Sequence, residues 1–268
     1  MTFVCSESDK GRIFEYISAE PEMNQFFYGD IESFGLGGDP VGVYAFGPSK
    51  NKWECLLLKY CGSYIIYSRG GVGSFDPSEA AAFLGDNKPE CISGKLESVK
   101  LLEPYFPAFS FEPTSLCRLT RADCRSTRSL MPGDTLRVLG SDDVDELTAL
   151  LGQIDEFSKS CHDSEKLKKD KLLNLSHGGI IWGAFSGGKL VSTAAITAPS
   201  SVSAMVVSVA TNPEYRGRGL ATAVVSALCE DCFSRGKKFL CLFYDNPAAA
   251  RIYKRIGFKD VGGYAMLH

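Results

Sequence analysis

The sequence predicts an α+β protein whose second half is built around one strand–turn–helix unit. Residues 205–211 (M-V-V-S-V-A-T) are rich in β-branched residues, as in a strand, and residues 220–235 follow a helical pattern. Between them, residues 213–221 read P-E-Y-R-G-R-G-L-A. Two further observations support the prediction. Gly187-Gly188 joins two strand-like runs, as in a two-residue hairpin, and Asn246 precedes a capped helical pattern.

Length and composition are those of a globular protein of one large or two modest domains. The 268 residues are 44% hydrophobic and 23% charged, with a formal net charge of −3. Neither half has the strong basic excess of a nucleic-acid-binding protein. The ten cysteines are scattered, and the one C-x-x-C string, Cys229–Cys232, lies within a predicted helix, so we expect free buried thiols and no metal. With no signal peptide and no long apolar run, we expect a cytoplasmic protein.

The first half mixes strands with short helices and shows no recognisable catalytic constellation. Its glycine-rich passages, 34–40 and 69–73, are interpreted as loops. The predicted elements are a helix at 8–19, a strand at 41–46, a hairpin of 53–60 and 63–68, a helix at 77–84 capped by Asp76 and closed by Gly85, a third helix at 94–102 and a strand at 116–120.

The turn cluster at Met131–Asp134 is the predicted domain boundary, which gives domains at 1–132 and 133–268. The second half then alternates in the order β-α-α-β-β-β-α-β-α-β. Its predicted elements are a strand at 135–139, a helix from Ser141 to about Phe157, a lysine-rich helix at 164–175 with a solvated face, a hairpin of 180–185 and 190–198, the strand–turn–helix unit, a buried strand at 239–244 and a helix from Asn246 to Gly257.

The turn after residue 211 has the chemistry of a pyrophosphate-binding loop. A helix start leaves its first N–H groups unpaired and carries partial positive charge, so it suits an anion. Gly217 and Gly219 allow the backbone to approach phosphate oxygens, while Arg216 and Arg218 add charge and forked donors. The alternative is a basic, glycine-rich surface turn.

Two known phosphate-binding patterns fit this turn poorly. No G-x-x-x-x-G-K-[ST] string occurs in the chain. A dinucleotide fingerprint needs G-x-G-x-x-G after a strand and an acid about 20 residues further on. The sequence has G-x-G-x-A, although Asp245, 26 residues after Gly219, keeps that interpretation open.

A third pattern fits both this turn and a second motif. Arg216–Ala221 (R-G-R-G-L-A) resembles, with its start relaxed, the acyl-CoA loop [QR]-x-x-G-x-[GA] of the GNAT superfamily of N-acetyltransferases. Residues 246–258 (N-P-A-A-A-R-I-Y-K-R-I-G-F) resemble that family's N-x-x-A-x-x-x-Y-x-x-x-G-F. The resemblance covers about 135–268. It implies a mixed, mostly antiparallel sheet flanked by helices, and it allows the first half to be a degenerate GNAT-like copy.

The resemblance also implies roles for individual residues. The backbone N–H groups of Val209, Ala210 and Thr211 would bind the pantetheine arm and the thioester carbonyl of acetyl-CoA, and Asn246 would contact the cofactor arm. Tyr253 matches the tyrosine that protonates the departing thiolate, and its structural alternative is a core tyrosine. The pyrophosphate would be held by the main chain of Arg216, Gly217, Arg218, Gly219, Leu220, Ala221 and Thr222.

The general base is not identified by the resemblance. Some relatives place a Glu on the fourth strand, but 205–211 carries no acid. Water relays the proton in one interpretation. In the other, a carboxylate comes from the first two helices, where Asp155 and Glu156 are nearest, with His162 and His177 in the same region.

The sequence therefore predicts an acetyl-CoA-dependent N-acetyltransferase acting on a small-molecule or peptide amine. We expect no nucleic acid and no membrane as partners, and a homodimer is the candidate assembly. The alternative is a non-catalytic acyl-CoA sensor, which the missing strand acid favours and Tyr253 disfavours.

Overall fold

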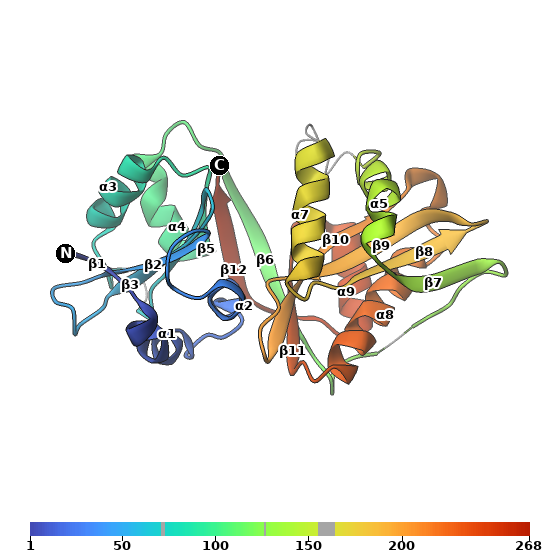
Figure 1. The fold of residues 1–268 in the computed structure, drawn as a ribbon, viewed down its shortest axis with the longest axis horizontal. Coiled ribbons are helices and arrows are strands. Elements are labelled where there is room, and N and C mark those ends of the chain that lie inside the picture. Colours follow the sequence, from blue (N-terminus) through green and yellow to red (C-terminus); the bar gives the residue numbers. More distant parts are fainter. Residues whose placement is uncertain (71–72, 126, 155–163) are drawn as a thin grey trace. The chain divides into compact units, whose positions relative to one another are not determined.

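The computed structural model describes residues 1–268 except 71–72, 126 and 155–163 (Figure 1). The chain divides into two compact units. Unit 1 comprises Met1–Cys117, Phe243–Asp245 and Asp260–His268, and unit 2 comprises Arg118–Leu242 and Asn246–Lys259. This division differs from the predicted boundary at 132/133. The reason is that the last strand of the chain is hydrogen-bonded in unit 1, which no local turn signal reveals.

Unit 1 is a mixed sheet with helices in the order β-α-α-β-β-β-α-β-α-β. Its elements are β1 (Thr2–Val4), η1 (Glu7–Asp9), α1 (Lys10–Ile17), α2 (Gln25–Phe34), β2 (Val41–Phe46), β3 (Cys55–Tyr60), β4 (Ser63–Tyr67), α3 (Pro77–Asn87), β5 (Cys91–Lys95), α4 (Leu96–Leu102), η2 (Glu103–Tyr105) and most of β6 (Phe111–Thr120) and β12 (Lys259–Leu267). The strand order is β1-β2-β3-β4-β5-β12-β6. The pair β4–β5 is parallel, whereas β5–β12 is antiparallel.

Several predictions for unit 1 need correction. Helix α2 was not predicted, and residues 94–95 belong to β5, not to a helix. Asp76 caps α3 as predicted, with its Oδ1 accepting the Ser78 N–H at 2.9 Å. However, α3 runs past Gly85 to Asn87, and the left-handed residue Lys88 caps its end. Alanine and leucine on its inner face bury enough surface in the unit 1 core to carry the helix through a glycine.

Unit 2 has the predicted order of elements up to α9, whereas the strand predicted to follow, β12, belongs mostly to unit 1. The elements of unit 2 are β7 (Asp134–Leu139), η3 (Ser141–Asp143), α5 (Val144–Leu151), α7 (Ser164–Ser176), β8 (Ile181–Ser186), β9 (Lys189–Thr197), β10 (Ser203–Thr211), η5 (Pro213–Tyr215), α8 (Leu220–Ser234), β11 (Phe239–Tyr244) and α9 (Pro247–Ile256). The strand order is β11-β10-β9-β8-β7, and only β10–β11 is parallel among the pairs β7–β8, β8–β9, β9–β10 and β10–β11.

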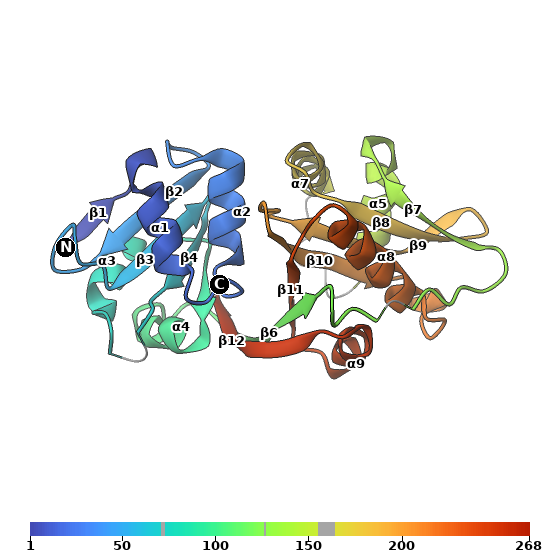
Figure 2. The same ribbon diagram turned by 90° about the horizontal axis from the view of Figure 1, so that it is seen from below.

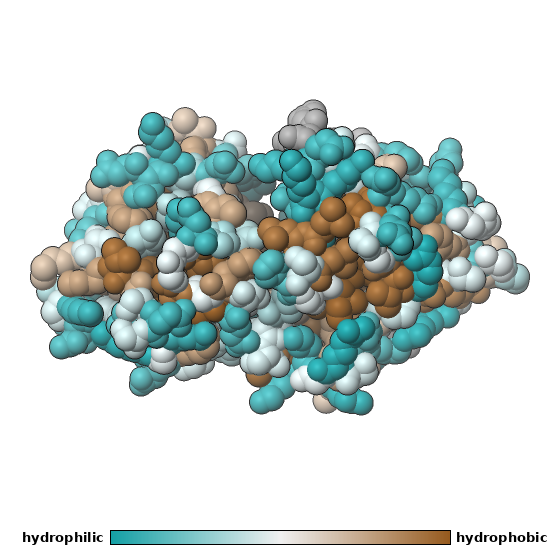
Figure 3. Space-filling model, in the orientation of Figure 1, coloured by the Kyte–Doolittle hydropathy of each residue, from teal (hydrophilic) through white to brown (hydrophobic). Residues whose placement is uncertain are grey.

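The helices of unit 2 cover both faces of its sheet. Figure 2 shows α5 and α7 on one face and α8 and α9 on the other. The predicted apolar stripe of α5 is buried, with Leu147 and Leu151 packed against β8 and β9 residues. This helix ends at Leu151, well before Phe157, because the chain turns at Gly152. Hydrophilic residues cover much of α7, and apolar residues gather on the same face of the unit (Figure 3).

Candidate functional site

Strand β10 opens away from its parallel neighbour halfway along its length. Its register with β11 covers Ser203–Met205 only, although β10 runs to Thr211. On its other side it pairs with β9 through a bulge, where Ser208 and Val209 lie between the paired residues Val207 and Ala210. Ser208 has a φ of 52°, which is unusual for a residue with a side chain. The bulge therefore leaves the second half of β10 bonded to β9 and free of β11 in the described register.

Strand alternation decides which backbone donors of β10 face a ligand. The Asn212 N–H donates to Val191 O of β9 at 2.9 Å. Because successive N–H groups point to opposite sides, the Ala210 N–H also faces β9, and the Thr211 N–H faces away from it. Val209 lies in the bulge, outside the regular ladder. Of the three predicted backbone donors, Thr211 thus faces away from β9 and Ala210 faces it, while the bulge places Val209 outside this alternation.

A buried asparagine that sequence reasoning missed shapes the start of the turn. Asn212 is 4% exposed, and its Oδ1 accepts the Glu214 N–H at 3.0 Å, which caps η5. Its Nδ2 donates to Gln153 Oε1 at 2.8 Å, just beyond α5. An asparagine directly before Pro213 is a turn signal that could have identified it. Asn212 therefore ties the turn to the segment after α5.

The two glycines of the turn require the conformation that glycine alone adopts readily. Gly217 and Gly219 both have a φ of 80°, and Gly219 is the N-cap residue of α8. The first intrahelical bond runs from the Ala223 N–H to Gly219 O at 3.0 Å. The N–H groups of Leu220, Ala221 and Thr222 therefore precede that bond, as at any helix start. No side chain caps this helix start, so it suits an anion.

The predicted arginines flank this helix start and are both exposed. Arg216 Nε donates to Thr211 O at 3.2 Å, and the Arg218 guanidinium lies 4.8 Å from the centroid of the Tyr215 ring. These contacts are worth little in water, so both groups can turn toward an anion at small energetic cost. The structure thus brings together β10, η5 and the α8 N-terminus as one electropositive turn.

The second motif forms helix α9, which packs against α8. Asn246 caps it, with Oδ1 accepting the Ala248 N–H at 2.8 Å, which leaves its amide NH₂ as a donor for a cofactor arm. Tyr253 is 7% exposed, and its ring meets Phe258 edge-on at 5.9 Å between centroids. Gly257 ends the helix with a φ of 114°. The ring of Tyr253 is therefore part of the core, and a role for its hydroxyl stays a prediction.

Candidate bases from the first two helices are mostly undescribed. Asp155, Glu156 and His162 lie outside the described residues. His177 Nδ1 lies 3.0 Å from Leu173 O and 3.1 Å from Ser176 Oγ, a local arrangement at the end of α7. Lys171, predicted as part of a solvated face, instead donates to Ser208 Oγ at 2.7 Å. No sequence pattern marked this contact between α7 and the bulge.

The cysteines of α8 have the properties of buried structural thiols. Cys229 and Cys232 are free and fully buried in the described structure. Burial raises the pKa of the Cys232 thiol to about 12, and it raises the pKa of Cys229 as well. A thiol that stays protonated at neutral pH is a poor nucleophile and a poor metal ligand.

The junction of β10 and α8 has the geometry of a site that binds a pyrophosphate together with a thioester. A strand that opens from its parallel neighbour, followed by a left-handed glycine turn at an uncapped helix start, can hold a pyrophosphate and a thioester arm. Residues 146–258 match the family model described as Acetyltransferase (GNAT) family. The chain carries a GNAT domain, and this family uses acyl-CoA as an acyl donor. The predicted resemblance is confirmed.

Solved structures share the fold over the whole chain, including the first half. A Drosophila protein matches with a TM-score of 0.71 at 13% identity, covering 99% of this chain and 97% of its own. A GCN5-related N-acetyltransferase from Sphaerobacter thermophilus gives 0.69 at 15%, covering 100% and 94%. A tandem GNAT protein from the clavulanic acid pathway gives 0.62 at 11%, covering 100% and 97%. The fold is therefore that of tandem GNAT proteins, with a GNAT-like unit 1.

No curated protein matches the sequence. Within the described part of the chain, no helix has both the length and the apolar character needed to cross a membrane.

Proposed function

We propose that this protein is an N-acetyltransferase that transfers an acetyl group from acetyl-CoA to a primary amine by direct attack. The observation that carries the proposal is the junction of β10 and α8, with its bulge, its two left-handed glycines and its uncapped helix start. The main chain from Arg216 to Thr222 would hold the pyrophosphate. The acceptor is a small-molecule or peptide amine.

The chain's own residues would then act in sequence. The N–H groups of Val209 and Thr211 would bind the pantetheine arm and polarise the thioester carbonyl, as an oxyanion hole does. A neutral amine attacks the carbonyl carbon of the thioester, and the C–S bond breaks. Tyr253 protonates the departing thiolate, which leaves as the thiol. Because β10 carries no acid, the amine proton passes to water or to a carboxylate of the first two helices.

A thermal-shift screen of acyl-CoA thioesters, followed by an amine panel with detection of released thiol, tests the proposal. We expect acetyl-CoA to raise Tm and at least one amine to release CoA thiol faster than the amine-free blank. Stabilisation by acyl-CoA with no thiol release across the panel would favour a non-catalytic acyl-CoA sensor. No stabilisation by any thioester would contradict both functions.

A further inference from the structure

Unit 1 contains a counterpart of the acyl-CoA turn that is built differently. It lies between β4 and α3, and its residues Ser68–Gly70 and Gly73–Asp76 are described. Like the turn after β10, it follows a strand that is parallel to the next one. However, Asp76 Oδ1 already accepts from the Ser78 N–H and, at 2.7 Å, from the Ser78 hydroxyl. The Asp76 carboxylate at the start of α3 repels anions, so this helix start is not suited to bind one.

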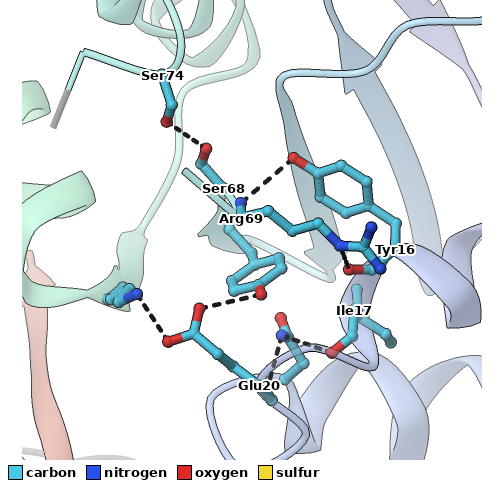
Figure 4. Close-up of polar contacts among 9 residues, drawn as sticks. Tyr16, Ile17, Glu20, Ser68, Arg69 and Ser74 are labelled. Carbon is cyan, nitrogen blue, oxygen red and sulfur yellow. Dashed lines mark hydrogen bonds and ion pairs between the residues drawn. The ribbon is translucent and has the colours of Figure 1, made fainter. Parts of the chain in front are cut away.

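The arginine of this turn instead folds back onto the end of α1 (Figure 4). Arg69 Nε donates to Tyr16 O at 2.6 Å, and Nη2 donates to Glu15 O. Its guanidinium lies 5.1 Å from the centroid of the Tyr16 ring, whose hydroxyl donates to Glu54 O at 2.7 Å. Two main-chain carbonyls therefore fix the guanidinium, and within the described structure its Nη1 has no acceptor. An arginine held in this way keeps its remaining donors oriented for a ligand.

A surface cavity of about 400 Å³, largely open to solvent, lies beside this arginine, and all its lining residues belong to unit 1. Its charged lining consists of Arg12, Lys52, Arg69 and Glu54, so cations outnumber carboxylates by two. Among the described residues, none of the three cations forms an ion pair. Three cations near one cavity repel one another, and a bound dianion would remove that repulsion.

The second arginine of the cavity is held as firmly as the first. The Arg12 guanidinium stacks on the Trp53 ring at 3.7 Å from its centroid, and its Nη1 donates to Lys50 O at 2.5 Å. Trp53 is 9% exposed, so the ring forms a rigid support under the charge. Two preordered guanidinium groups present forked donors, which match the oxygens of phosphate better than a single ammonium does.

We propose that this cavity binds a phosphate dianion, either free or carried by a small organic molecule. All residues of this site belong to unit 1, whereas the acyl-CoA turn belongs to unit 2. Its charge excess of two favours phosphate over a monoanionic carboxylate. Tyr16 and Trp53 also line the cavity and would contact an organic group.

The two tryptophans of the chain allow binding to be measured at this site alone. In the full-length Trp182→Phe variant, Trp53 is the only tryptophan, and Arg12 lies directly on its ring. We expect titration with inorganic phosphate at constant ionic strength to give a saturable change in fluorescence. Adding Arg69→Gln should weaken binding by at least about tenfold, since a hydrogen bond between a charged donor and the anion is lost. Lys52→Gln should weaken it by about threefold.

Matched controls separate a site from general charge screening. Lys100→Gln removes an exposed cation of α4 that does not line the cavity, and it should leave the titration unchanged. Phenyl phosphate binding more tightly than phosphate would assign an organic ligand, and equal affinity would assign inorganic phosphate. If Arg69→Gln fails to fold, Lys52→Gln decides, because Lys52 is exposed. A change that does not saturate, or one that Lys52→Gln and Lys100→Gln alter equally, would overturn the proposal.

Discussion

The two units share one order of elements but differ at the strand that leads into the central turn. In unit 2, β10 has nine residues, a bulge and a register of three positions with β11. In unit 1, β4 has five residues, of which four are in register with β5. The order of strands and helices therefore does not decide whether the central parallel pair, β4–β5 or β10–β11, separates along its length.

In unit 1, side-chain contacts hold the ends of β4 and β5 together, whereas in unit 2 the paired register of β10 and β11 stops after three residues. Glu20 Oε2 accepts the Tyr67 hydroxyl at 3.1 Å, and Glu20 Oε1 lies 2.7 Å from Lys95 Nζ (Figure 4). Tyr67 ends β4 and Lys95 ends β5, so one carboxylate bridges the two strand ends. Ser68 Oγ and Ser74 Oγ, 2.6 Å apart, close the following loop. We therefore infer that acyl-CoA binding in this fold depends on the strand end and turn, and we expect one acyl-CoA site, in unit 2.

The largest effect should come from the glycine that begins α8. Gly219→Val places a β-branched residue at a φ of 80°, which costs about 1–3 kcal/mol of backbone strain, and its side chain holds the backbone away from phosphate. We expect acetyl-CoA affinity, measured by calorimetry, to fall by about 100-fold, because a charge-assisted contact of about 1.5–3 kcal/mol is lost as well.

Gly73→Val is the matched control in unit 1. Gly73 has a φ of 88° in the counterpart turn, so the substitution introduces similar strain without touching the predicted site. Its acetyl-CoA affinity should match that of the wild type. Equal loss in both variants, or retained binding in Gly219→Val, would remove the distinction between the two turns.

Tyr253→Phe should have the next largest effect, on turnover alone. The change removes only the hydroxyl and keeps the ring against Phe258, so folding should survive. Proton transfer by a positioned side chain contributes about 10²–10⁴-fold, so we expect kcat to fall by at least about tenfold with acetyl-CoA affinity little changed. Tyr105→Phe, at a 48% exposed residue of unit 1, is the control. Unimpaired turnover would assign Tyr253 to packing, and lost cofactor binding would assign its hydroxyl a structural role.

The smallest expected effect is a difference in Tm between two fragments that place the boundaries of unit 2 differently. A fragment of residues 118–259 retains the Arg125 N–H bond to Ile256 O at 2.8 Å and the close approach of Gly257 to Asp123 O. A fragment of 134–268, drawn at the predicted boundary, loses both and carries β12 without β5. We expect the first fragment to melt several degrees above the second, since about 1 kcal/mol shifts the Tm of a domain this size by about 2–8 °C. Equal Tm values for the two fragments would instead support the predicted domain boundary near 132/133.

Local patterns in the sequence were sufficient for most elements and for the two motifs. The hairpin at Gly187-Gly188, the cap at Asn246 and the stop at Gly257 follow from turn and capping chemistry, which depends on adjacent residues. The R-G-R-G turn was recognisable for the same reason, because a left-handed glycine and a helix start are local features. Helix α2 was missed although Asn24 stands at its N-cap position and Gly35, with a φ of 76°, ends it, and both are local signals that could have identified it.

Tertiary structure decided the features that depend on residues distant in the chain. The pairing of β12 with β5 joins segments about 170 residues apart, and no local pattern specifies a strand's neighbour. The bulge at Ser208 arises from the register between β9 and β10, and Lys171 reaches it from α7. The contact of Asn212 with Gln153 depends on how η5 meets the segment after α5. The sequence alone thus determined which turn is predicted to hold an acyl-CoA, because the turn is local, while cross-strand hydrogen bonding decided which backbone donors beside that turn face away from β9.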